Sequence, residues 1–167
     1  EYVALARALL RDEGALRDRE ADLARVQQIG GVGGVEVDLS DGFRNLRSPE
    51  YLKIHGLPPE AATETHEDWV RRIHPDDRER TERQFIGAIK GDVRDYNAEY
   101  RIIRPNDGQV RWIAVKAEIE RDAAGRALRL VGAHIAITDA KLAELALRES
   151  EQRFRLVSES APVLAWM

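Results

Sequence analysis

Alternating apolar and polar residues mark three stretches in the second half of the chain. Residues 96–115 read as two strands joined by a turn, and a second turn at residues 122–125 leads to a third strand at residues 128–137. Three consecutive strands predict an antiparallel meander with one face to bury. We expect the remaining elements to cover that face.

The first half of the chain adds two shorter strands. Residues 35–39 alternate in the same way, and residues 43–47 follow a tight turn as a short second strand. Four glycines within residues 30–34 favour neither a helix nor a strand interior, so the first strand is expected to begin after them. With helices between the two groups of strands, the pattern predicts an α+β fold with a five-stranded antiparallel sheet and helices covering one face.

Helix signals fill the interval between the strands. Ser48 resembles the N-cap of a short helix, residues 65–73 carry a small apolar cluster, and residues 75–90 form a longer helix that opens with proline. After the meander, Thr138 can cap a last helix over residues 139–158.

Residues 1–29 read as one helix with an incomplete heptad repeat. Two of its seam positions are polar, Asp12 and Arg19, so the seam is only half apolar. Such a helix either pairs weakly with a second copy of itself or packs as a solvated helix on its own domain, and both alternatives stay open. The apolar seam positions, which form the candidate dimer helix, are Leu5, Leu9, Leu16, Leu23 and Val26.

Charge and composition narrow the function classes. Of the 167 residues, 34% are charged and 43% are hydrophobic, which indicates a soluble chain with exposed helices. A net charge of −4 provides no basic surface for nucleic acid, and no apolar run approaches the roughly 20 residues of a membrane span. With no signal peptide visible, we expect a cytoplasmic protein without direct membrane contact.

The motifs of common enzymes are missing from the sequence. The chain has no cysteine, which excludes disulfides, thiolate nucleophiles and cysteine zinc sites. No Walker sequence, dinucleotide-binding glycine pattern or nucleophile elbow occurs. The adjacent carboxylates Asp76 and Asp77 would diverge by about 100° on a helix, so they suit a helix N-terminus better than acid–base or metal chemistry. We therefore predict no catalytic residue, no metal site and no enzyme activity.

The four histidines are candidates for a haem or metal ligand. His134 shares a strand face with Leu128, Leu130 and Gly132, which makes it the best haem-ligand candidate of the four. A lone histidine on a strand face is more often packed or hydrogen-bonded than ligating, so the sequence disfavours haem.

Four separate stretches resemble one known family. They are the glycine-rich strand start at residues 31–39, Trp69 with the His-Pro-Asp-Asp turn at 74–77, the Glu-Tyr-Arg-Ile segment at 99–102 followed by Asp-Gly at 107–108 and Arg-Trp-Ile at 111–113, and Gly132 before the Ile-Thr pair at 137–138. Their order and spacing over residues 30–141 resemble a PAS sensor domain of the type whose second half carries the PAC motif.

The resemblance implies a PAS fold flanked by long N- and C-terminal signalling helices. It divides the chain into a helix at 1–29, the domain at 30–138, a linker helix at 139–158 and the truncated start of a second PAS domain at 159–167. Since the chain begins with Glu1 and stops within an apolar segment, we expect it to be a piece of a larger protein.

Tandem PAS domains are typical of bacterial sensor histidine kinases and diguanylate cyclases, so the resemblance implies a parent in two-component signalling. The expected function is a sensory, regulatory domain that forms a homodimer through its flanking helices. It would relay conformational signals to downstream PAS or kinase domains of the same chain, with a histidine kinase as the first choice of output. The alternatives are a sensor in which small-ligand chemistry is primary, a diguanylate cyclase regulatory module, and a structural spacer.

PAS ligands usually occupy a cavity between the sheet and its helices. Here the alternatives are such a cavity, with a small-molecule ligand, and a fully packed core. Flavin chemistry of the cysteine-adduct type is excluded because no cysteine exists, and with haem disfavoured the cofactor stays unknown. The candidate cavity residues are Trp69, Ile73, Phe85, Ile89, Tyr100, Ile102 and His134.

The end of the last strand resembles the point where PAS domains pass their signal onward. The family's exit motif is usually Asp-Ile-Thr, and here Ala136 stands at the aspartate position before Ile137 and Thr138. This departure removes the usual polar latch between the sheet and the linker helix, although Asp139 offers a carboxylate nearby. We take these four residues as the candidate signal exit.

Overall fold

The computed structural model describes residues 17–22, 25, 31–61 and 63–160 of the 167. The chain divides into two compact units, the first ending at Ala136 and the second beginning at Ile137. The predicted dimer-helix positions Leu5, Leu9, Leu16, Leu23 and Val26 lie outside the described residues, and so does most of the predicted second PAS segment.

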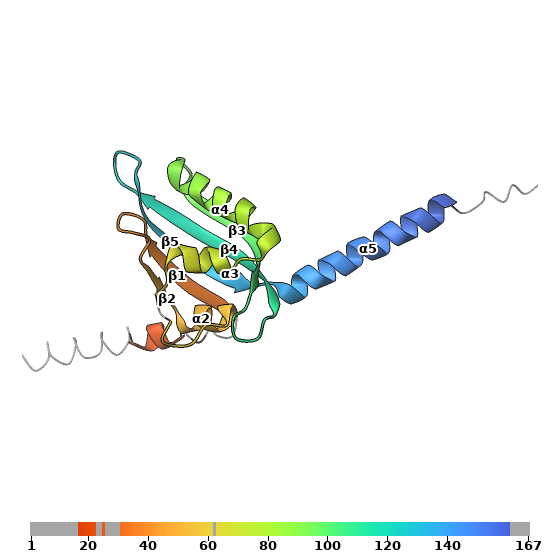
Figure 1. Ribbon diagram of the computed structural model, residues 1–167, viewed down its shortest axis with the longest axis horizontal. Helices are drawn as coiled ribbons and strands as arrows, with labels where there is room; N and C mark the ends of the chain where they lie inside the picture. Colours follow the sequence, from red (N-terminus) through yellow and green to blue (C-terminus); the bar gives the residue numbers. More distant parts are fainter. Residues whose placement is uncertain (1–16, 23–24, 26–30, 62, 161–167) are drawn as a thin grey trace, which may run out of the picture. The chain divides into compact units, whose positions relative to one another are not determined.

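A five-stranded antiparallel sheet forms the centre of the first unit, which confirms the predicted fold class (Figure 1). Its spatial order is β2-β1-β5-β4-β3, so the long meander continues at one edge into the pair of short strands. The strands are β1 (Val32–Asp38), β2 (Asn45–Arg47), β3 (Asp95–Ile103), β4 (Val110–Arg121) and β5 (Ala127–Ala136).

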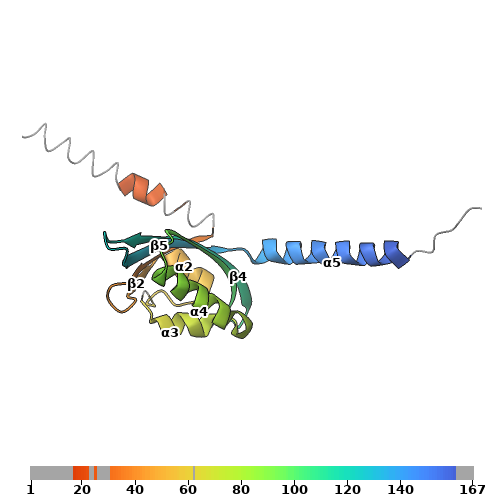
Figure 2. The ribbon, with the colours of Figure 1, turned by 90° about the horizontal axis from the view of Figure 1, so that it is seen from above.

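Three helices lie on one side of this sheet, as Figure 2 shows from above. They are α2 (Pro49–His55), α3 (His66–Arg72) and α4 (Pro75–Lys90). Helix α2 contacts β1 and β5, while α4 contacts β3. The predicted cap is present, because the Ser48 hydroxyl accepts a hydrogen bond from the Tyr51 backbone N–H at 3.3 Å.

The strand register determines which side chains face the helices. Strand β3 is buried at every second position, and Tyr100 pairs with Ile113 of β4. On the other side of β4, Val115 pairs with His134 of β5, and His134 in turn pairs with Gly33 of β1. The helix-covered face therefore carries His134 in the middle of the sheet, among apolar residues.

The first strand begins earlier than the sequence pattern predicts. We expected the glycine-rich segment to lie outside the strand, but β1 starts at Val32 and includes Gly33 and Gly34. A Cβ atom at Gly33 would lie 2.4 Å from the Cα of Tyr51 and 2.6 Å from its nitrogen. Gly33 is part of the strand through its pairing with His134 of β5, and it must be glycine because helix α2 passes too close for any side chain.

Asp77 has a role that the sequence interpretation missed. Besides lying in the first turn of α4, it accepts hydrogen bonds from the backbone N–H and the Nε of Arg101, each at 2.9 Å, and from its Nη2 at 2.8 Å. These bonds hold the start of α4 against β3. The hydrogen bonds from the Arg101 side chain lower the pKa of Asp77 to about 2.

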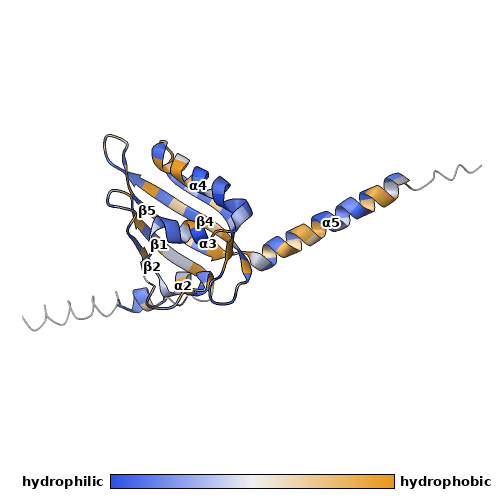
Figure 3. Cartoon of the chain, in the orientation of Figure 1, coloured by the Kyte–Doolittle hydropathy of each residue, from blue (hydrophilic) through white to orange (hydrophobic). Residues whose placement is uncertain are grey.

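The second unit contains helix α5 (Thr138–Ser160), which starts one residue before and ends two residues after the predicted bounds. Apolar residues recur along it (Figure 3), and Leu142, Leu145, Leu147 and Phe154 are among its exposed large side chains. Among the helices that the structure describes, none combines the length and the hydrophobicity needed to cross a membrane.

Candidate functional site

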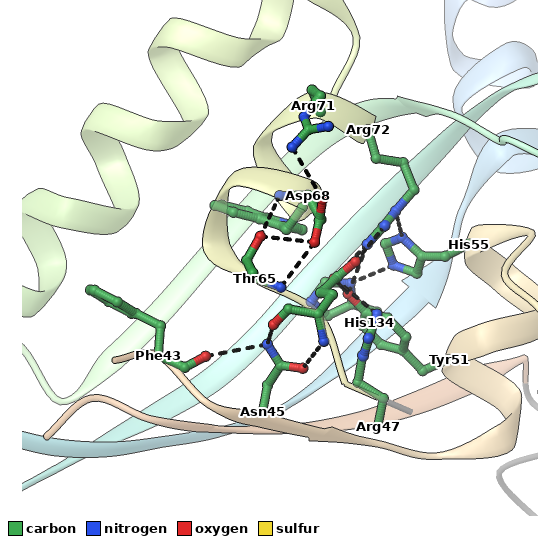
Figure 4. A network of polar contacts seen from close by, with 12 residues as sticks. Phe43, Asn45, Arg47, Tyr51, His55, Thr65, Asp68, Arg71, Arg72 and His134 are labelled. Carbon is green, nitrogen blue, oxygen red and sulfur yellow. Dashed lines mark hydrogen bonds and ion pairs between the residues drawn. The ribbon is translucent and has the colours of Figure 1, made fainter. Parts of the chain in front are cut away.

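A cluster of buried polar side chains lies between the sheet and helices α2 and α3 (Figure 4). It consists of Arg47 from β2, Tyr51 and His55 from α2, Glu64 from the loop before α3, Arg72 from α3 and His134 from β5. The side chains of Arg47, Glu64 and Arg72 are all less than 10% exposed. Buried polar groups at this density require mutual hydrogen bonds, and the cluster provides most of them.

Hydrogen bonds run in one direction through the two histidines. Arg72 donates from its Nε to the Nδ1 of His55 at 3.0 Å, and because a guanidinium only donates, this Nδ1 carries no proton. The proton of neutral His55 is therefore on its Nε2, which lies 2.9 Å from the Nδ1 of His134 and donates to it. Neutral His134 then carries its own proton on Nε2.

Both histidines are neutral at physiological pH. Burial lowers the pKa of His55 well below its usual value, and the neighbouring His134 adds to that effect. Burial also lowers the pKa of His134 to about 3, with a further contribution from the positive charge of Arg72. The pair is consequently a hydrogen bond between two neutral rings, with His55 as the donor and His134 as the acceptor.

Glu64 provides the negative charge of the cluster. Arg72 donates to both of its carboxylate oxygens, at 2.6 and 2.7 Å, in the bidentate geometry that makes arginine–carboxylate pairs strong. Nη1 of Arg47 lies 2.9 Å from Oε1 of the same glutamate. That contact is an ion pair by distance, but its angles are not those of a hydrogen bond.

The local sequence explains how Glu64 and Arg72 reach this position. The side chain of Asn45 bonds to both the backbone N–H and the carbonyl of Glu64, at 3.2 and 2.9 Å, which holds the loop against β2. Thr65 and Asp68 form a capping box that starts α3 immediately afterwards. Arg72 then lies in the last turn of this short helix, pointing at Glu64.

Aromatic rings surround the polar cluster. The Tyr51 ring stacks on His55, with 4.1 Å between ring centroids and an interplanar angle of 12°. The indole Nε1 of Trp69 donates to the Tyr100 hydroxyl at 3.1 Å, and Phe85 packs 5.2 Å from Trp69. These rings place apolar surface beside the polar groups of the cluster.

A cavity of about 60 Å³ adjoins the cluster. Polar side chains occupy part of its wall and aromatic or aliphatic side chains the rest. Its lining residues are Val35, Val37, Phe43, Asn45, Arg47, Tyr51, Glu64, Thr65, His66, Trp69, Phe85, Tyr96, Tyr100, Val115, Leu130 and His134.

Four of the seven candidate cavity residues lie at this cavity: Trp69, Phe85, Tyr100 and His134. The other three, Ile73, Ile89 and Ile102, pack in the adjoining hydrophobic core and are not among the lining residues. Whether any of the seven contacts a ligand stays a prediction.

The signal-exit residues lie at the boundary of the two units. Ala136 is the last residue of β5, Ile137 follows it, and Thr138 and Asp139 begin α5. Their role in signalling stays a prediction.

Sequence reasoning missed the residues that give the cluster its charge. The sequence pattern does not single out Arg47, Glu64 or Arg72, and it assigns no partner to His55. One signal was present, because Arg72 stands three residues after Trp69 and one before Ile73, within the apolar cluster of the 65–73 segment. A cation at such a position predicts a buried partner.

The remaining histidines have structural contacts. His66 lies 3.2 Å from a carboxylate oxygen of Glu82 and stacks on Phe85, and the Nδ1 of His74 accepts from the Asp76 backbone N–H at 3.3 Å. Within the described part of the chain, no three histidine, aspartate or glutamate side chains come together in the geometry of a metal site.

Comparison with known proteins places this chain in a family. Residues 45–134 match the family described as the PAS fold. The two-component sensor PprA of Pseudomonas aeruginosa is 31% identical over 96 residues, which cover 57% of this chain and 10% of that protein. The sensor protein FixL of Bradyrhizobium diazoefficiens is 34% identical over 95 residues, which cover 56% of this chain and 18% of that protein. The chain therefore spans less than a fifth of the length of either relative.

Solved structures show the same fold. A sensory box histidine kinase/response regulator from Burkholderia thailandensis is 27% identical with a TM-score of 0.67, and the match covers 80% of this chain and 97% of that one. The N-terminal domain of a diguanylate cyclase with PAS/PAC sensor from Marinobacter aquaeolei is 23% identical with a TM-score of 0.59, covering 66% and 98%. Since the family match spans more than half of the chain and the sheet and helices agree with it, this chain belongs to the PAS fold family, as a sensory domain resembling those of sensor histidine kinases and diguanylate cyclases.

Proposed function

We propose that this chain is a non-catalytic, cytoplasmic regulatory PAS domain that dimerises and passes its conformational state along its flanking helices to an output domain, with a histidine kinase as the first choice. The observation that carries the proposal is the connection at the end of the sheet. Strand β5 ends at Ala136, and a single residue, Ile137, precedes helix α5. A change in the register or twist of β5 would therefore act directly on the start of that helix.

Helix α5 supports the dimer part of the proposal. Ala140, Ala143, Leu147, Ser150 and Phe154 follow one another at spacings of three and four residues, as the seam of a coiled coil does. Leu147 is 61% exposed and Phe154 is 75% exposed. Exposed apolar side chains in this arrangement are explained by pairing with the same seam of a second copy.

Substitutions on opposite faces of α5 test the dimer. Leu147→Glu puts a charge into the seam, whereas Leu145→Glu puts the same charge on the other side of the helix. In sedimentation velocity, we expect a concentration-dependent dimer for the unchanged chain and for Leu145→Glu, and a monomer for Leu147→Glu. A monomer for all three chains at high concentration would refute the dimer relay.

A sensor in which ligand chemistry is primary is the second candidate, and the cavity beside the buried cluster favours it. The two candidates differ in what controls the state of β5: the arrangement of two copies in the first, and the occupant of the cavity in the second. Native mass spectrometry of the chain purified from cells separates them, because a stoichiometric small molecule would support the second.

A further inference from the structure

Arg47 is the least satisfied polar residue of the buried cluster. Its side chain is fully buried, yet its Nε, Nη1 and Nη2 have no hydrogen-bond acceptor among the residues that the structure describes. Its guanidinium lies 5.4 Å from the centroid of the Tyr51 ring, and Arg47 is one of the residues that line the cavity. Its ion pair with Glu64, 2.9 Å from Nη1, lacks hydrogen-bond geometry. A guanidinium has five N–H donors, and burying them without hydrogen-bond acceptors is destabilising unless another partner occupies the space beside them.

The charges around the cavity do not balance. Arg47 and Arg72 are two cations, while Glu64 is the single anion of the cluster and pairs with both of them. The neutral His55 and His134 and the protonated Tyr51 add no charge, since burial raises the pKa of Tyr51 to about 12. The cluster therefore carries one net positive charge beside the cavity, and one bound anion would neutralise it.

The rest of the cavity wall indicates what kind of anion fits. The other lining residues are mostly aliphatic or aromatic, with Val35, Val115, Leu130 and Phe85 among them. At about 15 Å³ for each water-sized group, a 60 Å³ cavity holds about four such groups, far less than a haem or a flavin needs. The space is that of a very small organic molecule with one charged and one apolar end.

We propose that this cavity binds a short-chain monocarboxylate of about two or three carbons, with its carboxylate on Arg47 and its alkyl end against the apolar wall. A planar carboxylate matches the paired N–H groups of a guanidinium, so it can accept two parallel hydrogen bonds from Arg47. The neighbouring Glu64 carboxylate repels a second negative charge, which disfavours phosphate, sulfate and dicarboxylates.

The proposal goes beyond the dimer relay and does not depend on it, because every residue of the site belongs to the first unit. The Leu147→Glu chain should thus bind the carboxylate as well as the unchanged chain does. Failure of the dimer would leave the binding result intact, and failure of binding would leave the dimer intact.

Isothermal titration with propionate, at constant ionic strength and pH 7, tests the site on the full 167-residue chain. Propionamide has nearly the same shape without the charge and serves as the ligand control. Arg47→Gln removes the proposed partner, and Arg44→Gln, an exposed arginine paired with Asp41 three residues away, is the matched protein control. Arg47→Lys keeps the charge but loses the planar fork, so it tests the site in a second way.

We expect saturable propionate binding by the unchanged chain and by Arg44→Gln, at least about tenfold weaker binding by Arg47→Lys and Arg47→Gln, and none of propionamide. Equal binding of propionate and propionamide would overturn the proposal. So would unchanged binding by Arg47→Gln, or no saturation by any carboxylate of this size up to about 10 mM. The comparison of the two ligands on the unchanged chain decides the matter even if a variant fails to fold.

Discussion

His55 donates a hydrogen bond from its Nε2 to the Nδ1 of His134 across 2.9 Å, joining helix α2 to the central part of the sheet. The two residues are far apart in the sequence, and neither forms the bond without the other. Since Arg72 fixes the tautomer of His55 from the opposite side, the pair works only while both rings are neutral.

Stability should therefore fall as the pH is lowered through the usual histidine range. The pKa of each histidine is lower in the folded state than the value of about 6.5 in the unfolded chain. For His134 the folded-state pKa is about 3. Between the folded and unfolded values the unfolded state therefore binds more protons than the folded state. The stabilisation is complete above pH 6.5 and is lost below it, at about 1.4 kcal/mol per pH unit for each histidine. Between pH 6.5 and 5 we expect a loss of up to about 4 kcal/mol in the free energy of unfolding.

Urea unfolding followed by circular dichroism at several pH values measures this slope. His134→Gln keeps a hydrogen-bonding side chain on β5 but removes one titrating group, so it should show about half the slope over the same range. Equal slopes for the two chains would mean that His134 is not buried in its neutral form.

The Asp77–Arg101 pair should stabilise the contact between α4 and β3. Because the folded-state pKa of Asp77 is lowered to about 2, its contribution is present above the unfolded value of about 3.9 and is lost as the pH falls towards 2. We expect Asp77→Asn to lower the free energy of unfolding by about 2.5 kcal/mol at pH 7 and by about half of that at pH 3.

The adjacent Asp76 provides the control for this prediction. It lies in the same helix turn but is 73% exposed and 3.8 Å from Arg101. Asp76→Asn should therefore change the free energy of unfolding by less than about 1 kcal/mol at pH 7. If the two variants lost equal stability, the effect would belong to the helix N-terminus and not to the buried ion pair.

The close approach of α2 to β1 should make Gly33 irreplaceable. In Gly33→Ala the new methyl group would lie 2.4 Å from the Tyr51 backbone, so strand and helix must separate, at a loss of at least about 2 kcal/mol. At Gly34 the added Cβ would meet only Ser48, at 3.9 Å, and Gly34→Ala should change stability by less than about 1 kcal/mol. Thermal unfolding of both variants makes the comparison, and similar melting temperatures would contradict it.

Ala136 should influence the junction between the sheet and α5. Ala136→Asp restores the aspartate of the usual PAS exit motif two residues before α5 begins, where a carboxylate can accept from the first N–H groups of the helix. We expect slower amide hydrogen exchange across residues 134–145, with Ala136→Asn as the uncharged control showing a smaller change. Unchanged protection in the aspartate variant would show that this latch does not couple the two elements.

The sequence by itself determined the elements and the fold class. Alternation along 96–115 and 128–137 specifies strands because successive side chains of a strand face opposite sides, and only one side is buried. Ser48, and Pro75 at the first position of α4, specify helix starts because they suit the unpaired groups at a helix end. Each of these signals depends only on residues close together in the sequence, so it predicts an element without knowledge of which elements pack against one another.

Only the tertiary structure decided which polar residues are buried and what they do. Arg47, His55, Glu64, Arg72 and His134 come from five separate segments, and none carries a signal that names its partners. The start of β1 also depended on a neighbour, because Gly33 pairs with His134 of β5 in the sheet. A buried charge is stable only beside its partner, so the site was determined by how the segments pack and not by any one of them.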